Sequence, residues 1–277
     1  MRHMAQTIVL FFLVLSLQSA HGMYAMHVKK VAGKKALITA GTHGIGLAVA
    51  KEFVNRGGTA IVTSRSLENI DKFNKSLENN YKEKIFAVQG ELINQETAQS
   101  LFERIKEVDD DFDVLVNNAG LWNEVNFLDV NEKEMNDNFN VVKGTFFLTQ
   151  AVAKHWISKQ VRGAIVNIGS AWAERAVMVT PCTPHALQKA ALHAMGRSAG
   201  VELARYGIRM NTISLGTIGT LEHQNSLSKE FMSMYPMGRI GTYEETANLV
   251  VTLADENISG WMTGSVIDFS GGQNASR

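Results

Sequence analysis

The chain has 277 residues without a visible linker, a length that suits one large unit better than two domains. Its 27 basic and 27 acidic residues cancel to a formal charge of zero, and without a basic run this argues against a nucleic-acid-binding protein and favours work on small molecules. The single cysteine, Cys182, excludes an internal disulfide and a cysteine-based metal cluster, so we expect no metal site.

The first 22 residues differ in character from the rest. A basic start precedes an apolar run over residues 8–17, and a small residue follows at Ala20. The run is well short of the ~20 residues that a membrane-spanning helix needs, so we expect no stable membrane span. Residues 1–22 suit a signal peptide or an N-terminal extension, which would place the protein on a secretory route or in a periplasm. If Met23 or Met26 is the true start, the protein is expected in the cytoplasm.

From residue 35 onward, short apolar runs alternate with stretches whose apolar residues recur at helical spacing. Strands are predicted over residues 35–40, 59–64, 84–89, 112–118, 163–170, 208–215 and 265–270. Helices are predicted over residues 44–56, 67–80, 96–108, 132–158, 184–205 and 243–254. Because the strands are apolar without alternation, they indicate a parallel sheet covered by helices on both faces. The predicted fold class is therefore α/β, a doubly wound parallel sheet of the Rossmann type in a single domain over residues 30–277.

A glycine-rich turn, TAGTHGIG, lies between the first strand and the first helix. Glycines here permit a tight turn and let backbone N–H groups approach a pyrophosphate, while the helix N-terminus adds partial positive charge. The turn predicts a dinucleotide site. Its residues are Gly41, Thr42, His43, Gly44, Ile45 and Gly46, although His43 also suits an ordinary turn residue.

The end of the second strand indicates which dinucleotide is bound. An acidic residue there would bind the ribose hydroxyls of NAD, whereas the sequence TSRS offers Ser64 and Arg65. A hydroxyl and a guanidinium suit the 2′-phosphate of NADP. NADP is therefore the expected cofactor, with NAD less favoured, although Arg65 alone would also suit a solvent-facing strand end.

Together with VNNAG at residues 116–120 and PHALQKAAL at residues 184–192, this turn makes the chain resemble the short-chain dehydrogenase/reductase family. The likeness runs from about residue 35 to residue 272 and includes GAIVNIGSAWA, IRMNTISLGTIGT and GSVIDFSGG. The resemblance implies hydride transfer between a nicotinamide and a carbonyl or alcohol carbon. It further implies cofactor contacts from Glu91, Asn118, Ala119, Gly120, Lys189, Gly216 and Thr220.

The family's chemistry uses a tyrosine that gives or takes the proton and a lysine four residues later that lowers the tyrosine pKa and holds the ribose. A serine binds the substrate oxygen, and an asparagine helps to organise a proton relay. Ser170 and Lys189 fit their places, but His185 occupies the place of the tyrosine. Counting back from the glycine of KGTFF places Val141 at the relay position, and Asn140 fits if the register slips by one.

Two interpretations of His185 stay open. A histidine titrates near neutrality and both of its nitrogens can take part in proton transfer, so it suits a substitute acid, although a nearby lysine would lower its pKa. Alternatively, the protein binds a dinucleotide without turnover and acts as a binding or regulatory protein. A further departure is Ala40, which stands where the family usually has the first glycine of the turn.

The region after Thr220 is where this family shapes its substrate pocket. Met232, Met234 and Met237 lie there, and flexible apolar side chains suit a hydrophobic substrate or ordinary packing. His223 is expected to be a surface residue. The resemblance also implies a homodimer or homotetramer, assembled through the helices over residues 132–158 and 184–205.

Overall fold

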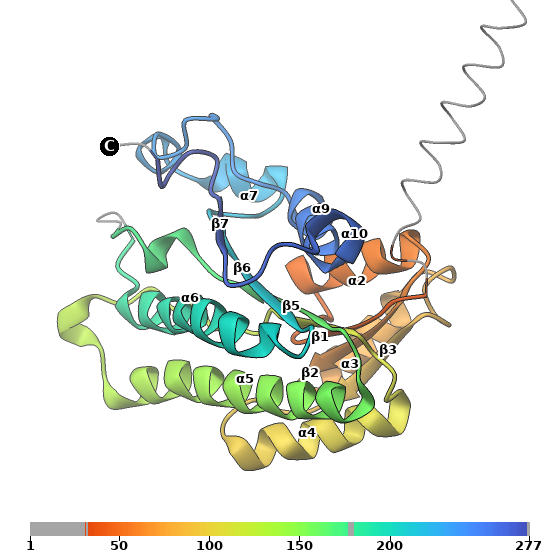
Figure 1. Ribbon diagram of the computed structural model, residues 1–277. Helices are drawn as coiled ribbons and strands as arrows, with labels where there is room; N and C mark the ends of the chain where they lie inside the picture. Colours follow the sequence, from red (N-terminus) through yellow and green to blue (C-terminus); the bar gives the residue numbers. More distant parts are fainter. Residues whose placement is uncertain (1–30, 32, 177–179, 276–277) are drawn as a thin grey trace, which may run out of the picture.

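The computed structural model describes residues 31, 33–176 and 180–275 (Figure 1). In this part of the chain, a seven-stranded sheet has all neighbouring strands parallel, in the order β3-β2-β1-β4-β5-β6-β7. The predicted fold class is thereby confirmed. The expected leader over residues 1–22 lies outside the described residues.

The elements follow the predicted order. The strands are β1 (Lys35–Ile38), β2 (Thr59–Ser64), β3 (Ile85–Gln89), β4 (Val114–Asn117), β5 (Ala164–Ile168), β6 (Arg209–Leu215) and β7 (Val266–Phe269). The helices are α2 (Gly44–Asn55), α3 (Leu67–Ser76), α4 (Gln95–Val108), α5 (Glu132–Lys159), α6 (Thr183–Ala204), α7 (Leu221–Ser226), α8 (Lys229–Met232), α9 (Tyr243–Ala254) and α10 (Glu256–Ser259), with 3-10 turns η1 (Phe127–Asp129) and η2 (Ala171–Ala173).

The largest difference from the predicted bounds is in α3. The polar pattern predicts a helix to residue 80, but the helix ends at Ser76, and Leu77 is extended. Leu77 and Tyr81 are both buried in the core. Residues four apart share one face of a helix, so the burial of these two side chains is compatible with a continued helix and does not set its end. The chain instead turns after Leu77, where the Tyr81 N–H donates to the Glu78 carbonyl at 3.0 Å.

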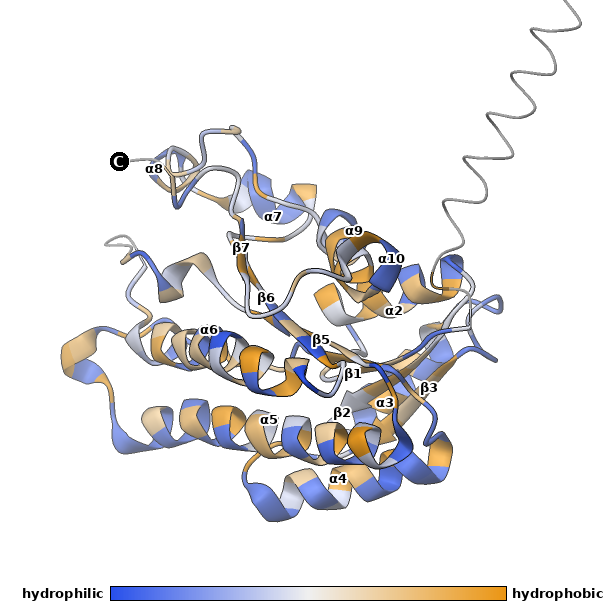
Figure 2. Cartoon of the chain, viewed as in Figure 1, coloured by the Kyte–Doolittle hydropathy of each residue, from blue (hydrophilic) through white to orange (hydrophobic). Residues whose placement is uncertain are grey.

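Helices cover both faces of the sheet. One core lies between the sheet and α2, α3 and α9, with Phe53 and Phe73 among its residues, and the other lies between the sheet and α4 and α5. Trp156 of α5 is fully buried in the second core, and its Nε1 donates to the Phe112 carbonyl at 2.7 Å. Figure 2 shows hydrophilic residues over much of the outer side of α4. Of the described helices, none has the length and apolar character to cross a bilayer.

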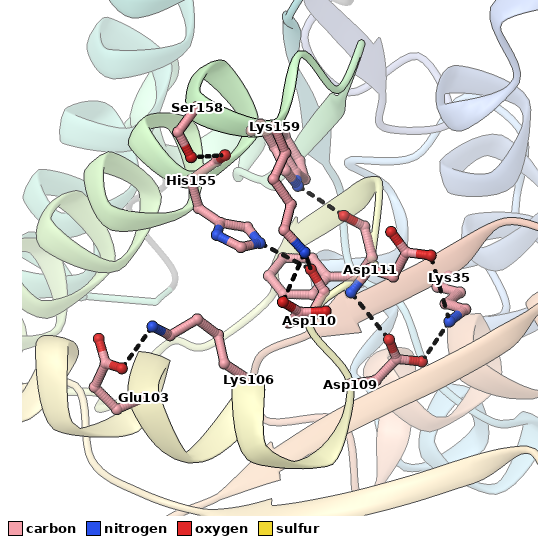
Figure 3. A network of polar contacts seen from close by, with 11 residues as sticks. Lys35, Glu103, Lys106, Asp109, Asp110, Asp111, His155, Ser158 and Lys159 are labelled. Atoms are coloured by element: carbon pink, nitrogen blue, oxygen red, sulfur yellow. Dashed lines mark hydrogen bonds and ion pairs between the residues drawn. The ribbon is translucent and has the colours of Figure 1, made fainter.

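A network of charges ties together the amino ends of the strands, and we call it the amino-edge network (Figure 3). Lys35 at the start of β1 lies 2.7 Å from Asp109, and Lys159 at the end of α5 lies 2.6 Å from Asp110. His155 donates from Nε2 to the Asp110 carbonyl at 2.8 Å. The hydrogen bond from Lys35 to Asp109 raises the pKa of Lys35, and the one from Lys159 lowers the pKa of Asp110. Each charge at this edge is therefore stabilised by an opposite one.

Candidate active site

A cavity of about 700 Å³ opens at the other edge, beyond the carboxyl ends of β4, β5 and β6. The loops after these strands, α6 and the segment from α7 to α8 form its walls. Parallel α/β sheets bind ligands at this edge, near the point where the strand order reverses. The predicted site residues that line the cavity are Ile45, Asn118, Gly120, Ser170, His185, Lys189 and Gly216.

The glycine-rich turn has the backbone that the cofactor prediction requires. α2 begins at Gly44, which has a φ of 53°, and Gly41 donates its N–H to the Thr63 carbonyl at 3.1 Å. A Cβ at Gly46 would lie only 2.7 Å from the side-chain nitrogen of Asn118, so a larger residue does not fit. Ala40 has a φ of 51°, the left-handed conformation that favours glycine. Ala40 therefore holds this conformation at a cost in strain.

The segment after β4 is joined to this turn. The side chain of Asn118 donates to the Thr39 and Ala40 carbonyls at 2.9 and 3.1 Å. The backbone N–H groups of Asn118 and Ala119 both donate to the Thr39 hydroxyl, at 3.0 and 2.9 Å. A Cβ at Gly120 would lie 2.9 Å from Lys189 Nζ, so this glycine makes room for the lysine. The predicted cofactor residues of the first and fourth strands therefore form one connected surface.

The predicted adenine end lies at the ends of β2 and β3. Ser64 is buried, and its hydroxyl accepts from the Ser66 N–H at 3.3 Å. Arg65 is exposed, and its guanidinium makes no ion pair with any residue that the structure describes. Glu91 and His43 are also exposed. A free guanidinium at this place is suited to a phosphate group.

Lys189 lies fully within the protein on α6. Its Nζ donates to the Ile168 carbonyl at 2.8 Å, and burial lowers the pKa of Lys189 to about 8. Among the described residues, no carboxylate forms an ion pair with it. Because it lines the cavity beside Gly120, its remaining N–H groups can serve a bound hydroxyl.

His185 lies one helical turn before Lys189 and is 8% exposed. Its Nδ1 lies 2.7 Å from the Leu121 carbonyl, and a carbonyl only accepts, so Nδ1 carries the proton. Burial lowers the pKa of His185 to about 4, with a further contribution from the charge of Lys189. At neutral pH the ring is therefore uncharged, and its Nε2 has a lone pair and no proton.

A second buried histidine, His193, supports Ser170. The Ser170 N–H donates to His193 Nε2 at 3.3 Å, and Nδ1 lies 3.1 Å from a carboxylate oxygen of Glu174. Burial lowers the pKa of His193 to about 4, so the ring is neutral and holds its proton on Nδ1 toward Glu174. The Ser170 hydroxyl accepts from the Trp172 N–H at 3.2 Å, which leaves its own proton free for a ligand.

The sequence prediction missed His193 and Glu174. A signal for the histidine was present, because His185, Lys189 and His193 recur every four residues and so share one face of α6. Glu174 had none, since it comes from the loop after β5.

The structure does not bring Asn140 into this group. Asn140 does not line the cavity and makes no side-chain hydrogen bond with the described residues. The buried asparagine of α5 is Asn138, which accepts from the Gln188 side chain at 3.1 Å. Gln188 in turn accepts from the Leu121 N–H at 3.3 Å. Asn138 therefore supports the loop that holds His185, and the relay position predicted at Asn140 or Val141 gains no polar group at the cavity.

The segment after β6 differs from its prediction in two places. Thr220 is exposed and caps α7, with its hydroxyl accepting from the His223 N–H at 3.2 Å, and it does not line the cavity. His223 is exposed, as predicted, but stands at the cavity wall. Leu227 and Phe231 line the wall, whereas the three methionines do not. Apolar side chains do shape this side of the cavity, but they are not the ones that the sequence suggested.

Comparison with known proteins gives one consistent picture. The family described as enoyl-(acyl carrier protein) reductase matches residues 39–274. The 3-oxoacyl-(acyl-carrier-protein) reductase FabG of Aquifex aeolicus is 34% identical over 250 residues, which cover 88% of this chain and 98% of that protein. A probable 2,4-dienoyl-CoA reductase of Bacillus subtilis is 30% identical over 87% of this chain and 96% of its own length. A crystal structure of a short chain dehydrogenase from Bacillus anthracis superposes with a TM-score of 0.78 and 30% identity, over 90% of this chain and 99% of that one.

Proposed function

Since the chain belongs to the short-chain dehydrogenase/reductase family, we propose that it is an NADP(H)-dependent oxidoreductase acting on a carbonyl or alcohol carbon, with His185 in place of the usual tyrosine. One observation carries the proposal. Lys189 and His185 line a single cavity directly beside the glycine-rich turn, and Gly120 leaves the space that the lysine needs.

The chain's own residues suit three parts of the cofactor. The backbone of residues 41–46 and the N-terminus of α2 suit the pyrophosphate, and Arg65 suits the 2′-phosphate that distinguishes NADP. Lys189 suits the ribose hydroxyls. The bound cofactor supplies hydride chemistry, and the protein then has to orient the substrate oxygen and manage one proton.

Proton transfer is where this protein departs from its family. The Ser170 hydroxyl is free to donate to a substrate oxygen, while the neutral His185 ring offers a lone pair at Nε2. With a pKa of about 4, only about one ring in a thousand is protonated at pH 7. A reaction that needs a proton from His185 therefore speeds up as the pH falls toward 4, because the protonated fraction grows. A reaction that needs His185 as a base is already near its limit at pH 7.

The same observation favours a second candidate function. A ring whose only proton at neutral pH is bound to the Leu121 carbonyl gives no proton to a ligand. A protein of this kind would bind NADPH and a ligand without turnover, as a binding or regulatory protein. The two candidates share the cofactor site and differ only in what His185 does.

The deciding experiment measures NADPH binding by fluorescence and NADPH oxidation with a panel of aldehydes, ketones and quinones, from pH 5 to pH 8. His185→Ala and His185→Tyr are compared with the native chain. For the enzyme, native turnover rises as the pH falls and is lost in His185→Ala. If NADPH binds, the native chain is silent at every pH and His185→Tyr gains turnover, the protein is the dinucleotide-binding relative.

We also propose that the protein is a homodimer or homotetramer. Phe139 and Phe146 lie seven residues apart on α5 and are 42% and 46% exposed, and Leu187 on α6 is 43% exposed. Together they give the two helices an apolar outer face, which suits a symmetric interface. Light scattering tests this: the native chain is expected at a multiple of its 30.5 kDa and Phe146→Glu at a lower mass. A native monomer would contradict it.

A further inference from the structure

Two tryptophan side chains lie next to the His185 ring in the cavity. Trp122 follows β4 and Trp172 lies in η2 after β5. Their ring centroids are 4.7 Å apart, and Trp122 meets the His185 ring edge to face at 4.9 Å. Both line the cavity, and Trp122 is 50% exposed. We call these two side chains the tryptophan pair. The reactive end of the site therefore has an open aromatic wall.

Apolar side chains continue this wall. Leu121, Leu227 and Phe231 line the same cavity. Thr217, Ser226 and Ser228 also line it, so hydroxyl groups lie beside the apolar surface.

The charges near the tryptophan pair argue against an anionic substrate beside the cofactor. Of the described residues that line it, only Lys189 is a lysine or arginine, and it is buried and donates to the Ile168 carbonyl. Glu124 is exposed at the wall and would repel an anion. The remaining ionisable groups there are His185, which is neutral at pH 7, and His223. A phosphate-bearing acyl carrier finds no cationic surface on this wall, whereas an uncharged ligand needs none.

We propose that this site binds an uncharged aromatic ketone, aldehyde or alcohol, whose ring packs against the tryptophan pair and whose oxygen faces Ser170 and His185. The substrate class rests on the proposed oxidoreductase function, but the binding step does not require turnover. Offset or edge-to-face contact between rings gives preference for a flat ring over an open chain of equal carbon content. Two relatives of this chain are named for acyl carrier protein and coenzyme A substrates, so the inference separates this chain from them.

Titration calorimetry on the full chain tests the proposal with three probes: 2-acetylnaphthalene, an open-chain methyl ketone with the same number of carbons, and acetoacetyl-CoA. The aromatic ketone is expected to bind at least tenfold more tightly than either of the others. Trp122→Leu and Trp172→Leu are each expected to weaken its binding about tenfold. Trp122→Phe keeps a ring and is expected to keep most of the affinity.

Trp261 provides the matched control, because it is fully exposed and does not line the cavity. Trp261→Leu should leave binding unchanged, and circular dichroism confirms that each variant is folded. The inference would be overturned if acetoacetyl-CoA or the open-chain ketone bound as tightly as the aromatic ketone or more tightly. It would also be overturned if both tryptophan variants bound the aromatic ketone as tightly as the native chain does. A separate measurement of NADPH binding distinguishes failure of the proposed function from failure of the proposed ligand class. If NADPH fails to bind while the aromatic ketone depends on the tryptophan pair, the proposed function fails and the binding site stands.

Discussion

The two edges of the sheet shift the pKa of a lysine in opposite directions. At the amino edge, Lys35 lies beside Asp109, and that hydrogen bond raises its pKa. At the carboxyl edge, Lys189 is buried without a carboxylate ion-pair partner among the described residues, and its pKa falls to about 8. The amino edge stabilises the charged form of its lysine, whereas burial at the carboxyl edge destabilises the charged form of Lys189. Shifts of this kind are typical of functional sites, so the contrast favours the carboxyl edge as the functional one.

The largest expected effect comes from replacing the lysine at the carboxyl edge, and it tests the comparison between the two edges. Lys189→Met should weaken NADPH binding and lower turnover about 100-fold or more, because the group proposed to hold the ribose is lost. It should not lower the melting temperature, since methionine fills a similar volume without a buried charge. Lys35→Met is the control and should leave NADPH binding unchanged. Equal effects of the two variants on binding would show that the edges do not differ as described.

A second prediction concerns acid stability. His185 and His193 both have pKa values of about 4, against 6.5 for a free histidine. Between pH 6.5 and pH 4 these two histidines bind protons in the unfolded chain but not in the folded chain. The free energy of unfolding therefore falls as the pH falls through this range. The loss is about 2 kcal/mol per histidine at pH 5 relative to pH 7.

Urea unfolding at pH 7 and pH 5 measures this loss. In His193→Leu the difference between the two pH values should shrink by about 2 kcal/mol, whatever the variant's absolute stability. Lys159→Met, which alters only the amino edge, should keep the native difference. An unchanged difference in His193→Leu would show that this ring is not held neutral.

A third prediction compares strain at the two edges. Ala40 at the carboxyl edge and Gln160 at the end of α5 are the non-glycine residues with positive φ among those described, at 51° and 57°. Replacing either with glycine should stabilise the fold by roughly 0.5–1 kcal/mol, as relief of the left-handed strain exceeds the added chain entropy. Thermal unfolding measures both. Ala40→Gly should also change NADPH affinity, whereas Gln160→Gly should not. An equal change of NADPH affinity in both variants would show that the strain at Ala40 has no specific relation to the cofactor site.

The smallest expected effect is at the amino-edge network. Lys159 and Asp110 are exposed, so Lys159→Met should lower the free energy of unfolding only slightly at low salt and less still at high salt. Unfolding at two ionic strengths is the measurement. A loss as large as that caused by emptying a core position would mean that this network contributes to the core stability of the fold.

The fold was predictable because its signals are local. β2 and α9 have the predicted bounds, 59–64 and 243–254. A run rich in β-branched residues indicates the strand, and an amphipathic stretch that begins after the Thr242 cap indicates the helix, so the signal for each lies within about a dozen residues. The error at α3 arose because the helical spacing of buried residues continues past the end of the helix. Phe73, Leu77 and Tyr81 are four residues apart and buried, although the helix ends at Ser76.

Helical geometry alone could bring together only the site residues of one helix, whereas Ser170 and Asn118 were predicted from the family resemblance. His185 and Lys189 are four residues apart on α6, so their proximity follows from helical geometry. Trp122 and Trp172 are 50 residues apart in the sequence and belong to two loops, and no periodicity relates them. In α5 the prediction was limited by register, because neighbouring positions point about 100° apart and a choice between Asn140 and Val141 excluded Asn138.

The parallel order at the centre of the sheet has a consequence for biosynthesis. β1 pairs with β4, and the paired residues Ala36 and Val114 are 78 positions apart in the chain. At a synthesis rate of 5–20 residues per second, β4 emerges roughly 4–16 s after β1. During that interval one edge of β1 has no partner, and an unpaired strand edge is a template for pairing with other chains. A strand that lies between two neighbours in the finished protein is thus one that the growing chain has to protect early.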